Sequence, residues 1–110
     1  MSYGIVFRGT YRYEDGDAAE RAVRAAREDV AYDEGEADAD LAAMVRDGFD
    51  RIVVRDGASI RIDVDQNGPP GLYPIYETLV ETLAGLATSG TVVSRMDGVE
   101  DEFPAGSEDG

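Results

Sequence analysis

The sequence predicts an α+β domain in which two helices cover one face of a four-stranded antiparallel sheet. The expected order is strand, helix, strand, strand, helix, strand, the ferredoxin-like βαββαβ arrangement. Two observations predict it. Apolar and polar residues alternate over residues 3–14, 51–65 and 91–96, as in strands with one buried face. Apolar residues also recur at every third or fourth position over residues 17–30 and 72–86, as in amphipathic helices.

The first strand and the first helix follow from residues 3–30. The strand's inward side is aromatic and aliphatic: Tyr3, Ile5, Phe7, Tyr11 and Tyr13. Gly9 also falls at an inward position, which indicates a bulge or the close approach of a helix. Asp17 and Glu20 have the spacing of a capping box, so a helix is expected to begin there. Its inward stripe consists mostly of small residues: Ala19, Ala22, Val23, Ala26 and Val30.

The middle of the chain predicts an acidic linker, a short element and a hairpin. Residues 32–40 form the linker, and residues 41–47 predict a short helix that ends at Gly48. The alternative is that 41–47 form a strand, with Asp47–Gly48 as a hairpin turn. Two further strands then alternate around the turn Asp56–Gly57. Their expected inward residues are Ile52, Val54, Ile60, Ile62 and Val64.

The C-terminal third predicts the main helix and the last strand. The helix spans residues 72–86, and we expect its core stripe to comprise Leu72, Ile75, Tyr76, Leu79, Val80, Leu83 and Leu86. A strand over Thr91–Met96 follows, and Asp97–Gly98 could turn the chain into a frayed extra strand that ends at Phe103. We therefore expect one domain over residues 1–103 and a disordered acidic tail over residues 104–110.

The charge composition is unusual. The 110 residues include 24 acidic and 10 basic side chains, for a net charge of −14, and every basic residue is an arginine. Surface carboxylates hold water and cations, and molar salt removes their mutual repulsion by shortening the Debye length to ~3 Å. The composition resembles that of proteins from extreme halophiles that accumulate salt. Without cysteine, a signal-like N-terminus or a long apolar run, we expect a cytoplasmic protein that does not enter a membrane.

The residue types present argue against an enzyme. The chain contains no His, Cys or Lys, which excludes the usual zinc sites, catalytic triads, Schiff bases and P-loops. Asp63 and Asp65 share one strand face, but any solvated strand in an acid-rich chain shows that spacing. We therefore expect no catalytic residue, no cofactor and no bound metal.

Arginines gather on the predicted strands and, by alternation, face away from the core. Together with outward valines they form a candidate interaction face: Val6, Arg8, Arg12, Arg51, Val53, Arg55, Arg61, Val93 and Arg95. Three interpretations are open: a ladder of cross-strand ion pairs with Asp63, Asp65 or Glu14, a contact with a protein or a second copy, and nucleic-acid binding. Because the face lacks an outward aromatic residue to stack on bases, we expect a non-enzymatic binding or regulatory module that contacts a protein or forms a homodimer, with nucleic-acid binding as the alternative.

Overall fold

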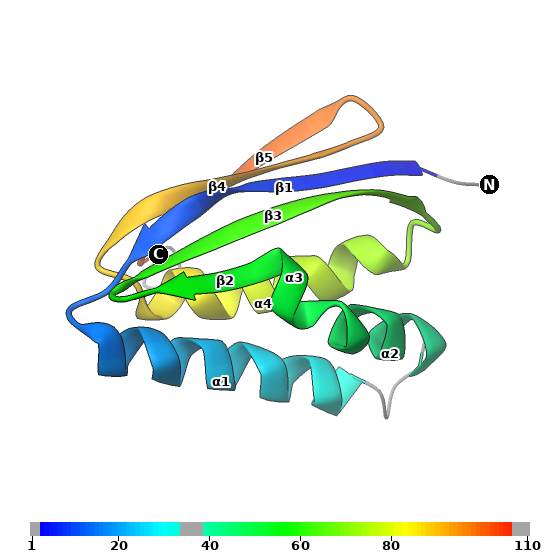
Figure 1. Cartoon of the computed structure of the whole chain (residues 1–110). Helices are drawn as coiled ribbons and strands as arrows, with labels where there is room; N and C mark the ends of the chain where they lie inside the picture. The colour runs from blue at the N-terminus through cyan, green and yellow to red at the C-terminus, as the bar shows by residue number, and fades with distance from the viewer. Residues whose placement is uncertain (1–2, 34–38, 107–110) are drawn as a thin grey trace.

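A computed structural model describes residues 3–33 and 39–106 of the chain. The elements are, in chain order, β1 (Tyr3–Arg12), α1 (Gly16–Asp33), α2 (Ala39–Asp47), α3 (Phe49–Ile52), β2 (Val53–Asp56), β3 (Ser59–Gly68), α4 (Leu72–Leu86), β4 (Ser89–Met96) and β5 (Val99–Pro104). The strands form one antiparallel sheet in the order β2-β3-β1-β4-β5. The helices of the described residues lie on one side of this sheet (Figure 1). The expected α+β class with an antiparallel sheet is confirmed.

The prediction of a four-stranded ferredoxin-like sheet is wrong in the number of strands, because β5 is a full fifth strand along the outer edge of β4. Asp97 and Gly98 both adopt positive φ angles, 53° and 79°, as a two-residue hairpin turn requires. Phe103 then anchors the strand by burying its side chain against the core. Val99 and Asp101 lie on the same side of the sheet as Phe103, but both are exposed and Asp101 is charged, so the alternation that predicts a strand is weak in β5.

The described structure continues past residue 103, where the sequence predicted the domain to end. Pro104 belongs to β5, and two hydrogen bonds hold the residues that follow it. The Ala105 amide donates to the Gly90 carbonyl at 2.9 Å, and the Gly106 amide donates to the Ala84 carbonyl at 2.8 Å. The remainder of the predicted tail, residues 107–110, lies outside the described residues.

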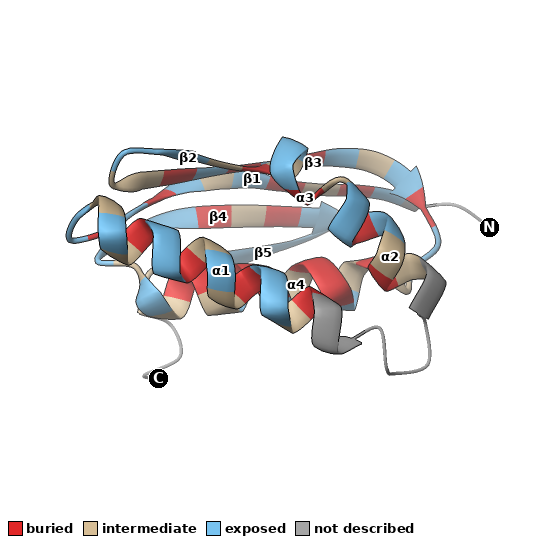
Figure 2. Cartoon of the chain, turned by 60° about the horizontal axis from the view of Figure 1, so that its bottom comes forward, coloured by how far each residue is buried: buried red, intermediate tan, exposed pale blue. Residues whose placement is uncertain are grey.

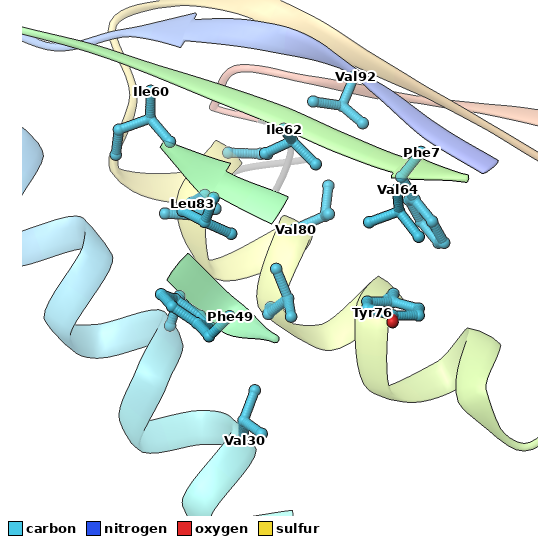
Figure 3. Packing of buried hydrophobic residues seen from close by; sticks show 14 of the residues in the cluster. Phe7, Val30, Phe49, Ile60, Ile62, Val64, Tyr76, Val80, Leu83 and Val92 are labelled. Atoms are coloured by element: carbon cyan, nitrogen blue, oxygen red, sulfur yellow. The ribbon is translucent and has the colours of Figure 1, made fainter. Parts of the chain in front are cut away.

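The core lies between the sheet and the helices (Figures 2 and 3). Alternate residues of β1 and β3 face it, and the stripe of α4 packs against them. Fully buried side chains from these elements include Phe7, Tyr11, Ile60, Leu72, Leu79 and Leu83. The small residues Ala19, Ala22 and Ala26 are also fully buried, which lets α1 lie close to α4. Leu86, expected on the core stripe, is instead 54% exposed because it closes the last turn of α4.

Residues 41–47 are helical, within α2, so the alternative of a strand there is wrong. Gly48 ends the helix without a left-handed conformation (φ −96°), and the short helix α3 begins at once. Phe49 is buried in the core at the start of α3. From α1, Arg27 lies 4.9 Å above the Phe49 ring and forms a 2.5 Å ion pair with Asp50, which ties α1 to α3.

Gly9, which occupies an inward position of β1, marks neither a bulge nor a contact with a helix. The pairing of β1 with β4 is continuous through Gly9, and the backbone of β4 is what approaches it. A Cβ atom at Gly9 would lie 2.1 Å from the Thr91 carbonyl oxygen, and one at Gly90 would lie 2.2 Å from the Thr10 carbonyl oxygen. The neighbouring strands β1 and β4 thus approach each other closely at two glycines.

Candidate interaction surface

The sheet has a second face, opposite the helices, on which no helix of the described residues lies (Figure 1). We call it the open sheet face. The strand register assigns to it every second residue of each strand. Residues from all five strands lie on this face. They include Val54 and Asp56 of β2; Ser59, Arg61, Asp63 and Asp65 of β3; Val6, Arg8, Thr10 and Arg12 of β1; Thr91, Val93 and Arg95 of β4; and Glu100 and Glu102 of β5.

Six of the predicted face residues lie on the open sheet face, and they come from the three interior strands: Val6, Arg8, Arg12, Arg61, Val93 and Arg95. The prediction fails for the three residues around β2. Arg51 belongs to helix α3, not to a strand. Val53 pairs with Ile62 and is buried in the core.

Arg55 is the third of these residues. It pairs with the buried Ile60, so the register assigns it to the helix side, where its guanidinium donates to the Gly57 carbonyl at 3.2 Å. All three errors have one physical reason. Ile52 is the last residue of helix α3, so the strand begins only at Val53 and its inward and outward positions are shifted by one residue from those that the sequence pattern indicates. Val54 takes the outward position that was assigned to Val53.

Two arginines of the open sheet face form exposed ion pairs with carboxylates on neighbouring strands. Arg8 contacts Asp63 at 3.2 Å and Asp65 at 3.0 Å, and so joins β1 to β3. Arg95 contacts Glu100 at 2.5 Å and joins β4 to β5. Such exposed pairs are each worth about 0–1 kcal/mol, so they orient side chains more than they stabilise the fold. The expected ladder is therefore present for Arg8, and Arg95 has a partner that the sequence reasoning missed.

Half-buried valines lie between these ion pairs. Val6 has Asp65 and Arg95 as its neighbours across the sheet, and Val93 has Arg8 and Glu102. A shallow hollow of about 300 Å³ connects the two valines and is bordered by Arg8, Arg95 and Glu100. The centre of the face is thus a small apolar patch with a polar rim, as in many protein contacts.

The net charge of the open sheet face differs sharply from that of the whole chain. The face has four arginines and five carboxylates (Asp56, Asp63, Asp65, Glu100 and Glu102), for a net charge of −1. The whole chain has a net charge of −14, so the remaining residues together carry −13. Nearly all of the excess negative charge lies elsewhere, and the face is close to neutral.

Titratable groups on the helix side are engaged in structure. The Tyr73 hydroxyl lies 2.7 Å from Ser94 Oγ, which is fully buried, and 3.4 Å from an Asp101 carboxylate oxygen. Burial raises the pKa of the Tyr73 hydroxyl, and the charge of Asp101 adds to this. Burial, with the charges of Glu81 and Asp101, likewise raises the pKa of Glu77. The Tyr73 hydrogen bonds link α4 to β4 and β5.

The described residues offer no cluster of three or more carboxylates, histidines or cysteines that could hold a metal ion. Among the helices of residues 3–33 and 39–106, none is long and apolar enough to cross a membrane. No family model, curated protein or solved structure matches the chain. The open sheet face therefore has to be interpreted from its own chemistry.

Proposed function

We propose that this protein is a small non-enzymatic binding module that associates with a second copy of itself through the open sheet face. The observation that carries the proposal is the charge distribution. Two copies that each carry a net charge of −14 repel each other over most of their surfaces. The open sheet face, with a net charge of −1 and an apolar centre at Val6 and Val93, is where this repulsion is smallest.

The composition of the face supports a copy of the same chain as the partner. A basic partner protein would be attracted to acidic surface anywhere on the molecule, whereas a copy of this chain gains most at its least acidic face. Because a twofold contact buries the same patch on both copies, arginines and carboxylates on one face can pair with their opposites on the other. Five strands spaced ~4.8 Å apart and about eight residues long offer roughly 650 Å², close to the ~800 Å² per partner of a standard interface.

The same surface is less suited to nucleic acid. Arg8 and Arg95 already contact carboxylates, and five carboxylates on the face would repel phosphates. The aromatic side chains of the cluster formed by Phe7, Tyr73, Tyr76 and Phe103 lie on the helix side. A face without aromatic stacking would hold single-stranded nucleic acid poorly, above all in concentrated salt.

We further propose that the protein works in the salt-rich cytoplasm of a halophile. The support is the excess of 14 negative charges and the use of arginine as the only basic residue. Concentrated salt screens the repulsion between copies to distances of ~3 Å, which would allow the faces to meet. The salt of the medium thus becomes a condition for association.

Sedimentation of the wild type and two variants in ~2 M KCl, a concentration that screens the charges strongly, tests the proposal. We expect a dimeric wild type, a monomeric Val6→Glu variant and a dimeric Leu86→Glu variant. The last is a matched control, because Leu86 is an exposed apolar residue on the helix side. A wild type that stays monomeric over the accessible concentration range contradicts the proposal. A monomer that binds a labelled oligonucleotide in the same salt would favour nucleic acid instead.

A further inference from the structure

Two arginines, Arg12 and Arg61, lie near each other at one end of the open sheet face. Arg12 and Arg61 form no side-chain hydrogen bond or ion pair with any residue of 3–33 or 39–106, although Arg8 and Arg95 on the same face both do. Arg61 lies directly across from Thr10, and Arg12 is the next outward residue of β1. They are therefore diagonal neighbours, at a typical Cα separation of ~7–8 Å, within reach of a shared ligand.

A hollow of about 440 Å³ lies beside these arginines, over the ends of β1, β2 and β3. It is lined by Thr10, Val54, Arg55, Asp56, Ser59 and Arg61. Arg12 is not one of the lining residues, but its partner across the sheet is the lining residue Ser59. On the open sheet face, Arg12 and Arg61 contribute +2 and Asp56 contributes −1, so the local charge is +1 in a chain whose net charge is −14. Two hydroxyl groups, from Thr10 and Ser59, also face the hollow.

We propose that this hollow binds the phosphate group of a small phosphate monoester, held between the guanidinium groups of Arg12 and Arg61 and the hydroxyl groups of Thr10 and Ser59. Two guanidinium groups match the double negative charge of a phosphate monoester, and their planar N–H donors suit its oxygen atoms. Arg55 is not part of this set, because its side chain lies on the helix side and its guanidinium donates to the Gly57 carbonyl. The site lies on the same open sheet face as the proposed self-association, so a dimer through that face would cover it and the ligand would bind the monomer. The two inferences rest on different residues, because self-association depends on Val6 and Val93.

The surroundings of the hollow favour a small ligand over a polymer. A strand of nucleic acid that continued along the face would next meet the carboxylates of Asp63 and Asp65, already engaged by Arg8. Asp56, on the wall of the hollow, would repel a second phosphate but can accept a hydrogen bond from a hydroxyl group. The ligand that fits is a single phosphate attached to a hydroxyl-bearing body.

NMR titration of ¹⁵N-labelled protein, with KCl adjusted to hold the ionic strength constant, tests the site. The probes are inorganic phosphate, glycerol phosphate and acetate. We expect saturable shifts for phosphate and glycerol phosphate at the amides of Thr10 and Ser59 and at the side-chain Nε–H of Arg61. Arg61→Gln should weaken this binding about tenfold or more through the loss of a charge-assisted contact. Arg95→Gln, which removes a paired arginine of the same face, should change it less than about twofold.

Several results would overturn the site. One is the absence of saturable shifts with either phosphate probe, and another is an equal loss of binding in Arg61→Gln and Arg95→Gln. Acetate that binds as tightly as phosphate would refute the phosphate assignment, and an oligonucleotide that binds more tightly than glycerol phosphate would refute the small ligand. Val6→Glu separates the two proposals, since it should abolish dimerisation and retain phosphate binding.

Discussion

The hydroxyl group of Tyr11 donates a hydrogen bond to the main-chain carbonyl of Phe103, so a central strand is tied directly to the edge strand β5. The partner of Tyr11 on the intervening strand β4 is Gly90, which has no side chain to obstruct this reach. Tyr13 makes a second link of this kind, since its hydroxyl donates to the Leu83 carbonyl of α4 at 2.8 Å. Both tyrosines are buried, and both hydroxyls must stay protonated to donate.

The fold should therefore be sensitive to alkaline pH. Burial is the main cause that raises the pKa of Tyr11 and Tyr13 above the ordinary value of 10.0, and their proximity adds to the shift at Tyr13. Because the unfolded chain ionises these groups first, their contribution to stability is complete below about pH 10 and falls as the pH rises above it. We expect the loss of far-UV circular dichroism to coincide with the tyrosinate absorbance of the buried tyrosines. Titration of all tyrosines near pH 10 in a chain that stays folded would refute this.

The close approach of β1 and β4 predicts that Gly90 cannot be replaced. A Cβ atom there would lie 2.2 Å from the Thr10 carbonyl oxygen, and the residue has a φ of 107°. Gly90→Ala should cost more than ~2 kcal/mol, as strained backbone and steric overlap together do. Gly4→Ala is the control, since its nearest neighbour would be the Asn67 side chain at 3.5 Å. Urea denaturation compares the two, and equal midpoints would mean that the strands can separate there at little cost.

The middle of α4 should be the most sensitive part of the core. Leu79 is fully buried, so truncation to alanine should destabilise the fold by ~2–5 kcal/mol. The same change at Leu86, 54% exposed on the same helix, should cost less than ~0.5 kcal/mol. Chemical denaturation monitored by circular dichroism measures both. An unchanged denaturation midpoint for Leu79→Ala would show that the packing of α4 against the sheet contributes little to the free energy of unfolding.

Stability should rise strongly with salt. The net charge of −14 acts against a folding free energy that is typically only ~5 kcal/mol or slightly more for a small domain. The melting temperature should therefore increase between ~0.05 M and ~2 M KCl, where screening becomes nearly complete. Sucrose serves as a control, because it stabilises folded proteins without screening charge. A melting temperature independent of KCl would remove the support for a halophilic protein.

Sequence periodicity predicted the long elements and the short helix at residues 41–47, and it failed at α3 and β2. β1, β3, α1 and α4 each repeat their pattern over ten or more residues, so an isolated exception such as Gly9 does not hide it. β2 has only four residues, and α3 takes up the apolar Ile52 just before it, which shifts the register of Val53 and Val54 by one. Over so short a span, a helical turn and a strand cannot be distinguished from the apolar pattern.

Residues of the candidate surface were assigned to the correct face wherever the strand that carries them was predicted correctly. Arg8, Arg61 and Arg95 were placed correctly because each lies on a strand whose alternation is clear. The pairing of Arg95 with Glu100 was missed because the sequence indicated only a frayed extra strand up to Phe103 and gave no register between that strand and β4. The hollow beside Arg61 depends on the register between β1, β2 and β3, which alternation within one strand does not provide.

The two outer strands determine what kind of assembly this protein can build. β2 exposes an edge only four residues long, and β5 carries Glu100, Asp101 and Glu102 in succession and ends at Pro104. Short, like-charged or proline-terminated edges resist the addition of further strands. These edges disfavour the joining of copies edge to edge into a continuous sheet, whereas the proposed contact through the open sheet face would occupy the same patch on both molecules. Self-association of the proposed kind would therefore stop at two copies.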